Sequence, residues 1–263
     1  MDLGLRSKVA LVAAASRGLG RAIAEELAAE GASLVLCARG EEALRAARDA
    51  IAETFGVQVT AVPADLSRIE DVGRVADAGL SEHGRIDILV TNTGGPPPGP
   101  FESHGPEAWE AAMQLLVRSA VELIRAVLPG MKERRYGRIV NVTSVAVKQP
   151  VDGLILSNAL RAAVTGMART LANEVAPLGI TVNNVLPGYT RTDRLLELSR
   201  AAARAEGTTA EEVVAGWEAR IPAHRLGESR ELAALTAFLA SERAGYITGQ
   251  SIAVDGGLVR GLL

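Results

Sequence analysis

Short runs of apolar, often β-branched residues alternate along the chain with longer stretches in which alanine and leucine recur at helical spacing. The short runs predict strands near residues 8–13, 33–38, 57–62, 87–91, 137–142, 179–185 and 251–254. The longer stretches predict helices near 18–30, 41–55, 68–83, 107–134, 155–176 and 229–240, with a less regular pair between about 192 and 220. Apolar strands that alternate with helices are typical of a parallel sheet covered on both faces. We therefore predict an α/β fold with a doubly wound parallel sheet of about seven strands.

Composition narrows the class of protein. With 263 residues, 48% of them hydrophobic, the chain can bury one large core, and neither a repeat nor a composition shift divides it. We expect a single domain over residues 1–263. The formal net charge of −3 and the lack of basic blocks argue against a nucleic-acid partner. Three scattered histidines offer no metal site, and the one cysteine, Cys37, lies in an apolar run as a small buried side chain.

Neither a membrane span nor a signal peptide is predicted. Every apolar run is too short to cross a bilayer, and the first four residues lack the charged-then-apolar profile of a secretory signal. We expect a soluble, cytoplasmic protein.

The turn after the first predicted strand is a candidate phosphate site. It reads Ala14-Ala-Ser-Arg-Gly18-Leu-Gly20 and leads directly into a helix. Because Gly18 and Gly20 have no side chains, a phosphate group could approach the backbone at the helix N-terminus, where free N–H groups and the helix dipole favour negative charge. An ordinary tight turn explains the same residues, so the motif alone does not decide between the two.

The end of the second predicted strand indicates which nucleotide would bind there. An acidic residue at this place bonds the ribose 2′-hydroxyl of NAD, whereas an arginine accommodates the 2′-phosphate of NADP. This chain has Ala38 followed by Arg39, and Arg17 lies within the glycine-containing turn. Two guanidinium groups can hold a phosphate through charge-assisted hydrogen bonds, so we predict NADP(H). Two solvated surface arginines are the alternative interpretation.

Further motifs follow in order over nearly the whole chain. They are Ala64-Asp65-Leu66, Leu89 to Gly94, Gly137 to Ser144, Ile180 to Gly188, Pro222 to Gly227 and Ile247 to Gly257. With the glycine-containing turn, they resemble the short-chain dehydrogenase/reductase family, close to the β-ketoacyl-acyl-carrier-protein reductases. The resemblance implies a Rossmann fold, an oxidoreductase activity and a homotetramer.

The resemblance also assigns a cofactor site. It places Asp65 at the adenine amine, Asn92 beside the adenosine ribose and Thr192 at the carboxamide. Ala14 departs from the glycine that the family has there, and its methyl group could crowd the turn. The full set is Ala14, Ser16, Arg17, Gly18, Leu19, Gly20, Arg39, Asp65, Leu66, Asn92, Gly94, Pro187, Gly188 and Thr192.

The catalytic positions depart furthest from the family. The family uses a serine to orient the carbonyl, a tyrosine to transfer the proton, a lysine to lower the tyrosine's pKa and an asparagine to anchor a water relay. By spacing, Ser144 matches the serine, whereas Ser157, Arg161 and Leu116 stand in the other three positions. An aliphatic hydroxyl is a far poorer acid than a phenol, and an arginine with a pKa above about 12 cannot shuttle protons. Leu116 cannot bind a water, so we expect the relay to be absent.

Two classes of function follow. The first is an NADP(H)-dependent oxidoreductase that acts on a ketone, an alcohol or an acyl thioester, with Ser144, Ser157 and Arg161 as orienting groups. The second is a catalytically weak or inactive NADP(H)-binding protein, a sensor or a supporting subunit, whose pocket recognises an anion through Arg161. We favour the first.

Other parts of the chain are expected to border the substrate pocket. The segment 190–220 is predicted to form a lid, and the proline-rich segment Gly94 to Pro100 a stiff wall. Tyr189 and Lys148 are the remaining acids near the pocket. We interpret Tyr189 as a wall residue and Lys148 as a solvated loop residue, not as replacements for the missing tyrosine.

Overall fold

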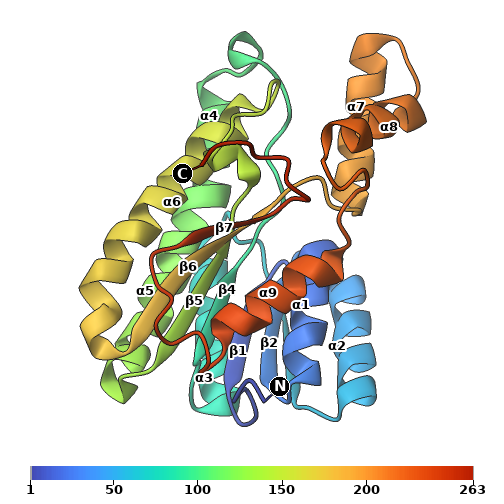
Figure 1. Ribbon diagram of the computed structural model, residues 1–263. Coiled ribbons are helices and arrows are strands. Elements are labelled where there is room, and N and C mark those ends of the chain that lie inside the picture. Colours follow the sequence, from blue (N-terminus) through green and yellow to red (C-terminus); the bar gives the residue numbers. More distant parts are fainter. Residues whose placement is uncertain (1, 263) are drawn as a thin grey trace.

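A parallel sheet of seven strands forms the centre of the computed structural model, which describes residues 2–262 (Figure 1). The strands are β1 (Val9–Ala13), β2 (Ser33–Ala38), β3 (Val59–Pro63), β4 (Ile88–Thr91), β5 (Gly137–Val142), β6 (Ile180–Pro187) and β7 (Ser251–Val254). Their order in the sheet is β3-β2-β1-β4-β5-β6-β7, so the direction of winding reverses between β1 and β4. Ligands of such sheets bind beyond the carboxyl ends of the strands at this reversal. The predicted doubly wound fold is confirmed.

Helices cover both faces of the sheet. Helices α1 (Gly18–Ala29), α2 (Glu41–Phe55) and α9 (Ser229–Ala240) lie on one face, and α3 (Ile69–His83), α5 (Ser119–Arg134) and α6 (Ile155–Val175) lie on the other (Figure 1). Successive side chains of β1 point to opposite faces of the sheet, so this strand packs against both layers of helices. Ala10 and Val12 belong to the apolar cluster with α1 and α9, whereas Leu11 and Ala13 belong to the cluster with α3, α5 and α6. Cys37 is fully buried in the second cluster, as predicted, and burial raises the pKa of its thiol to about 12.

The helix predicted over 107–134 is interrupted. It consists of α4 (Pro106–Met113), a π-helical turn at Gln114–Arg118, and α5. The extra residue in a π-helical turn shifts the helical register, and such turns are frequent at functional sites. Leu116 lies within this turn and is 4% exposed.

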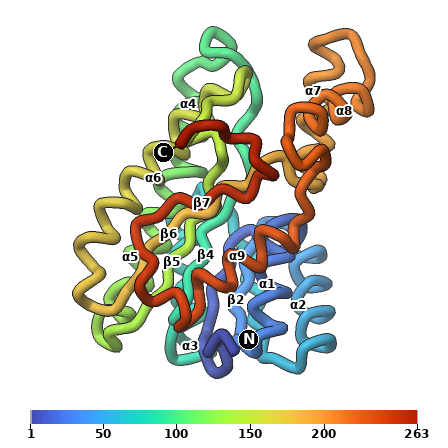
Figure 2. The backbone as a smooth tube through the Cα atoms, in the orientation of Figure 1, coloured from blue at the N-terminus to red at the C-terminus, as the bar shows by residue number. Residues whose placement is uncertain are grey.

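Helices α7 (Asp193–Glu206) and α8 (Ala210–Arg220) stand apart, above the carboxyl ends of the strands (Figure 1). They have a small apolar cluster of their own, in which the ring of Tyr189 stacks on Trp217 with 4.8 Å between centroids. In Figure 2 the chain enters this pair after β6 and leaves it toward α9. The C-terminal segment after β7 then passes from the end of α8 to the loop after β5, where the Arg260 N–H donates to Gln149 Oε1 at 3.4 Å. Within residues 2–262 no helix is long and apolar enough to cross a membrane.

Candidate active site

The glycine-containing turn joins β1 to α1 at the reversal of the sheet. A Cβ atom at Gly20 would lie 2.3 Å from the carbonyl oxygen of Ala14, so only glycine permits this close approach of helix and strand. Ala14 itself has a left-handed backbone with a φ of +50°, which costs a residue with a Cβ atom about 1–2 kcal/mol. The departure from the family's glycine therefore appears in the structure as backbone strain.

The N-terminus of α1 is open to an anion. In the described chain no side chain caps this helix, because the N-cap residue is Arg17. The first N–H groups of α1 are therefore available to a phosphate. Ser16 is half-buried in the turn, and Leu19 packs partly against the core.

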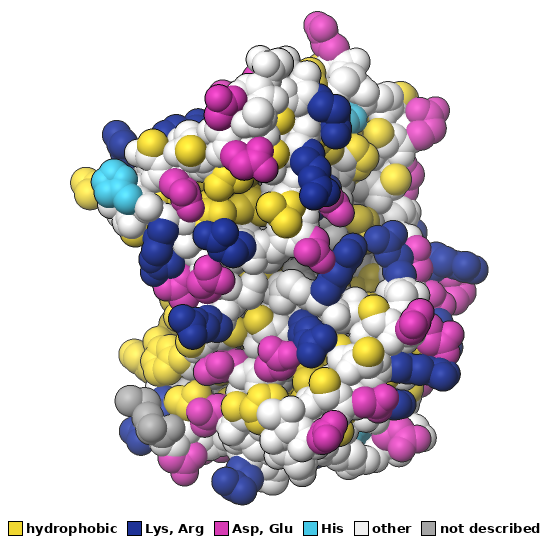
Figure 3. Space-filling model, turned by 90° about the vertical axis from the view of Figure 1, so that its right-hand side faces the viewer, with side chains coloured by type: hydrophobic (Ala, Val, Ile, Leu, Met, Phe, Trp, Pro, Cys, Tyr) yellow, Lys and Arg dark blue, Asp and Glu magenta, His cyan; other side chains and the backbone are white. Residues whose placement is uncertain are grey.

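Arg17 and Arg39 both reach solvent at this end of the sheet. Arg17 Nη1 lies 3.5 Å from Asp193 Oδ2 at the start of α7, and both side chains are about two-thirds exposed. Arg39 follows β2 and is exposed. Figure 3 shows a hollow between the part of the surface formed by α7 and α8 and the part formed by α1 and α2, with basic side chains gathered along it.

The other predicted cofactor residues line the same edge of the sheet. Asp65 follows β3, and its Oδ1 accepts hydrogen bonds from the N–H and the hydroxyl of Ser67. Leu66 is buried in the core at 7% exposure, so its side chain does not face the hollow. Asn92 and Gly94 follow β4, and the space beside Gly94 is open for 4 Å around a built Cβ atom.

Pro187, Gly188 and Thr192 connect β6 to α7. Pro187 ends β6, and the Gly188 N–H donates to Val254 O at 3.0 Å, which holds the connection against β7. Thr192 caps α7, because its Oγ1 accepts from the Leu195 N–H at 3.3 Å. The methyl group of Thr192 would lie 3.7 Å from a Cβ atom at Gly18, so α7 begins directly above the glycine-containing turn.

The three predicted catalytic residues surround the end of β5. Ser144 follows this strand, and its Oγ accepts from the Ala146 N–H at 3.1 Å. Ser157 lies in the first turn of α6, and its Oγ accepts from Arg161 Nε at 3.1 Å, one helical turn further on. Arg161 Nη1 donates to Val142 O at 3.1 Å. Ser157 and Arg161 therefore form one unit that is tied to β5.

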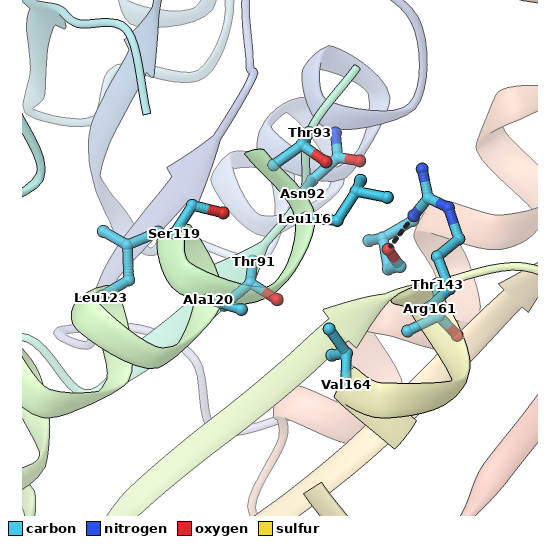
Figure 4. Close-up of a pocket in the computed structure, with 11 residues that line it drawn as sticks. Thr91, Asn92, Thr93, Leu116, Ser119, Ala120, Leu123, Thr143, Arg161 and Val164 are labelled. Atoms are coloured by element: carbon cyan, nitrogen blue, oxygen red, sulfur yellow. Dashed lines mark hydrogen bonds between the residues drawn. The ribbon is translucent and has the colours of Figure 1, made fainter. Parts of the chain in front are cut away.

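A small cavity lies beside this unit (Figure 4). Asn92, Leu116, Thr143, Arg161 and Val164 are among its lining residues, and its volume of about 20 Å³ has room for one water molecule. Leu116 points into the space between Asn92 and the guanidinium of Arg161, and it packs in one cluster with Leu156 and Leu160. Thr143 Oγ1 is buried and has no hydrogen-bond partner within residues 2–262.

The surroundings of Arg161 change the pKa of its guanidinium group. Burial, and then the nearby charge of Arg194, lower the pKa of Arg161 to about 10. The prediction of a pKa above about 12 was therefore wrong, because the sequence does not show that the fold half-buries this side chain beside a second arginine. Arg161 still carries its charge at neutral pH. Within residues 2–262 no carboxylate forms an ion pair with it.

Arg194 is a site residue that the sequence analysis did not identify. It lies in the first turn of α7, and its Nη2 donates to Pro96 O at 2.8 Å. The proline-rich segment thus contacts α7 on one side. On the other side it contacts the start of α6, where the Gly99 N–H donates to Gly153 O at 2.6 Å. No sequence signal marked Arg194, because its partner Pro96 is 98 residues away.

Tyr189 and Lys148, the two other acids, differ in their surroundings. Burial raises the pKa of Tyr189, whose ring is stacked on Trp217, and Lys148 is exposed. Within the described residues no group of three or more metal-ligating His, Cys, Asp or Glu side chains is present.

Known proteins are similar to this chain in both sequence and fold. A family model described as Enoyl-(Acyl carrier protein) reductase matches residues 13–259. The chain is 36% identical to the 3-oxoacyl-acyl-carrier-protein reductase of Haemophilus influenzae, over 97% of this chain and 99% of that protein. The structure of L-sorbose reductase from Gluconobacter frateurii, complexed with NADPH and L-sorbose, matches with a TM-score of 0.94 at 35% identity and covers all of both chains. An actinorhodin polyketide ketoreductase variant with NADPH matches with a TM-score of 0.93 at 32% identity, over 97% of this chain and 98% of that one.

Proposed function

This chain belongs to the short-chain dehydrogenase/reductase family, and we therefore propose that it is an NADP(H)-dependent oxidoreductase of the 3-oxoacyl-acyl-carrier-protein-reductase type. The reaction is hydride transfer to or from a ketone, an alcohol or an acyl thioester. The observation that carries the proposal is the open N-terminus of α1, which lies at the reversal of the sheet beside the exposed Arg17 and Arg39.

The residues at the strand ends fit the cofactor. The uncapped N–H groups of α1 would bind the diphosphate, and Arg17 with Arg39 would bind the 2′-phosphate. Arg17 would have to leave Asp193, but an exposed ion pair is worth only about 0–1 kcal/mol. Asp65, Asn92 and the segment from Pro187 to Thr192 complete the proposed site, together with the backbone of Leu66 and Gly94.

Ser144 and Ser157 would act as hydrogen-bond donors to the substrate. Each Oγ already accepts a hydrogen bond, from the Ala146 N–H and from Arg161 Nε respectively, so each proton is free for a substrate carbonyl oxygen. NADPH, when bound, supplies the hydride. The charge of Arg161 then stabilises the oxyanion through Ser157. Because a serine hydroxyl is a poor acid, the proton comes from water, and loss of a dedicated general acid typically lowers the rate about 10²- to 10⁴-fold.

The second candidate function is a catalytically weak or inactive NADP(H)-binding protein that acts as a sensor or a supporting subunit. Leu116 favours this alternative, because its side chain fills the place where the family resemblance puts the relay asparagine. The cofactor groove is common to both candidates, so only turnover separates them.

The proposal extends to assembly and to the entrance of the site. Helices α7 and α8, within residues 190–220, would act as a lid, because they stand above the carboxyl ends of the strands with an apolar cluster of their own. By the family resemblance we also propose a homotetramer in the cytoplasm and a carbonyl or alcohol substrate.

The experiment has two stages. First, the purified protein is titrated with NADPH and NADH, and cofactor fluorescence reports binding. Ketones and acyl thioesters are then added, and absorbance at 340 nm reports consumption. Slow consumption of NADPH supports the oxidoreductase, and tight binding without consumption supports the alternative. Failure to bind NADPH would contradict both.

A further inference from the structure

Two arginine side chains reach the segment after β4 from opposite elements. Arg161 of α6 lines the small cavity together with Asn92 and Thr93. Arg194 of α7 donates to Pro96 O, and its guanidinium lies 3.0–3.3 Å from a Cβ atom built on Gly95. The two guanidinium groups thus lie beside neighbouring parts of one segment, Arg161 near Asn92 and Thr93 and Arg194 near Gly95 and Pro96. They are also close enough that the charge of Arg194 lowers the pKa of Arg161.

Within residues 2–262 no carboxylate forms an ion pair with Arg161. Its two acceptors, Ser157 Oγ and Val142 O, are neutral, and the remaining N–H groups of its guanidinium have no partner within residues 2–262. Arg194 has one acid nearby, Glu197 at 3.4 Å, which lies on the exposed side of α7. Arg161 is half-buried, so its unpaired N–H groups remain accessible to a ligand. The folded chain thus holds two cations along one segment, and one of them has no ion-pair partner within residues 2–262.

We propose that Arg161 and Arg194 together bind the carboxylate of an oxo-acid substrate, with its carbonyl oxygen at the hydroxyl groups of Ser144 and Ser157. This inference rests on the proposed function, and it narrows the substrate class. Reduction would convert the oxo acid, NADPH and one proton from water to the hydroxy acid and NADP⁺. Because Arg161 bonds directly to Ser157, the carboxylate has to lie only one or two carbon atoms from the reacting carbonyl.

The chemistry of the two groups favours a carboxylate. A guanidinium is planar and offers paired N–H donors that match a carboxylate through two parallel hydrogen bonds. The cavity of about 20 Å³ is too small for an anionic group, so the carboxylate would lie outside it, bound by Arg161 from α6 and by Arg194 from α7. An acyl thioester has no free carboxylate at this position, so free 2-oxo or 3-oxo acids are favoured over acyl-carrier-protein thioesters.

The test compares two substrates that differ by one charge, acetoacetate and methyl acetoacetate. Initial rates of NADPH oxidation are measured for the natural chain, Arg161→Gln, Arg194→Gln and the control Arg204→Gln, which changes an exposed arginine of the same helix α7. A charge-assisted hydrogen bond is worth about 10- to 100-fold in binding, so we expect kcat/KM to favour acetoacetate by at least about 10-fold. Arg194→Gln should abolish this preference mainly through KM, whereas Arg204→Gln should keep it.

A binding measurement separates this inference from the proposed function. Calorimetric titration of the NADP⁺-loaded protein with acetoacetate needs no turnover. Binding that is lost in both Arg161→Gln and Arg194→Gln supports the anion site even if no substrate is reduced. Equal kcat/KM for the acid and its ester overturns the inference and leaves the oxidoreductase in place. If Arg194→Gln weakens NADPH binding and the preference for acetoacetate persists, Arg194 serves the cofactor diphosphate, and the inference also falls.

Discussion

Restoring a phenol and an amine on α6 should raise the reductase activity. The change is Ser157→Tyr with Arg161→Lys, two residues of one helical face that already bond to each other at 3.1 Å. A positioned general acid contributes about 10²- to 10⁴-fold, which is about 2.7–5.4 kcal/mol of the barrier at 1.36 kcal/mol per decade. The phenol would supply the proton that the serine hydroxyl supplies poorly, and the neighbouring ammonium would lower the phenol's pKa.

The structure places the expected gain at the lower end of this range. Leu116 is 4% exposed and packs against Leu156 and Leu160, so the water relay stays blocked in the double variant. The variant also loses the hydrogen bond from Arg161 to Val142 O, which fixes the side chain against β5. We therefore expect an increase of about 10²-fold and not about 10⁴-fold.

The assay uses a neutral ketone, because the variant also removes the guanidinium of Arg161. Initial rates of NADPH oxidation with methyl acetoacetate are compared with those of a matched control, Ser157→Phe with Arg161→Lys, which adds the same ring without its hydroxyl. Circular dichroism melts confirm that both variants fold. Equal rates in the tyrosine and phenylalanine variants would show that the side chain at this position does not reach the reacting carbonyl, and would refute the reasoning.

Three further predictions concern the cofactor groove and stability. Ala14→Gly removes the strain of a left-handed backbone at φ +50° and should stabilise the fold by about 1 kcal/mol. The expected measurement is a rise of about 2–4 °C in Tm. An unchanged Tm would argue against strain. Arg39→Asp should weaken NADPH binding by about 10- to 100-fold and spare NADH, and a parallel loss of both in fluorescence titrations would contradict the assignment. Hydrogen bonds from Arg225 and from the Glu228 N–H lower the pKa of Glu231 to about 2. A carboxyl group whose pKa is lower in the folded than in the unfolded state stabilises the fold at pH values above the unfolded pKa. The urea midpoint of the natural chain should therefore exceed that of Glu231→Gln by its largest amount at pH 7, and the difference should shrink as the pH falls from about 4.5 to 2. A pH-independent difference would contradict the ion pair.

Local sequence patterns were sufficient to predict the helices, the strands and the parallel sheet. The strand predicted near 33–38 and the helix predicted near 41–55 have these bounds in the structure, because apolar periodicity and the glycines at their ends depend on neighbours a few residues away. The same reasoning missed the π-helical turn at Gln114–Arg118, since the apolar spacing continues through it. It also placed the end of β6 at 185, before Pro187, where pairing with Val254 extends the strand.

The candidate site was predicted only as a set of positions. The sequence by itself determined which residues follow each strand, and by the family resemblance it assigned Ser157, Arg161 and Leu116 to the positions of the tyrosine, lysine and asparagine. The tertiary structure decided that Arg161 is held by Val142 O, that its pKa falls to about 10, and that Arg194 faces it from a helix contributed by a distant part of the chain. The reason is that an element forms from interactions within a few residues, whereas the energy of a charge depends on its burial and on partners that only the folded chain brings together.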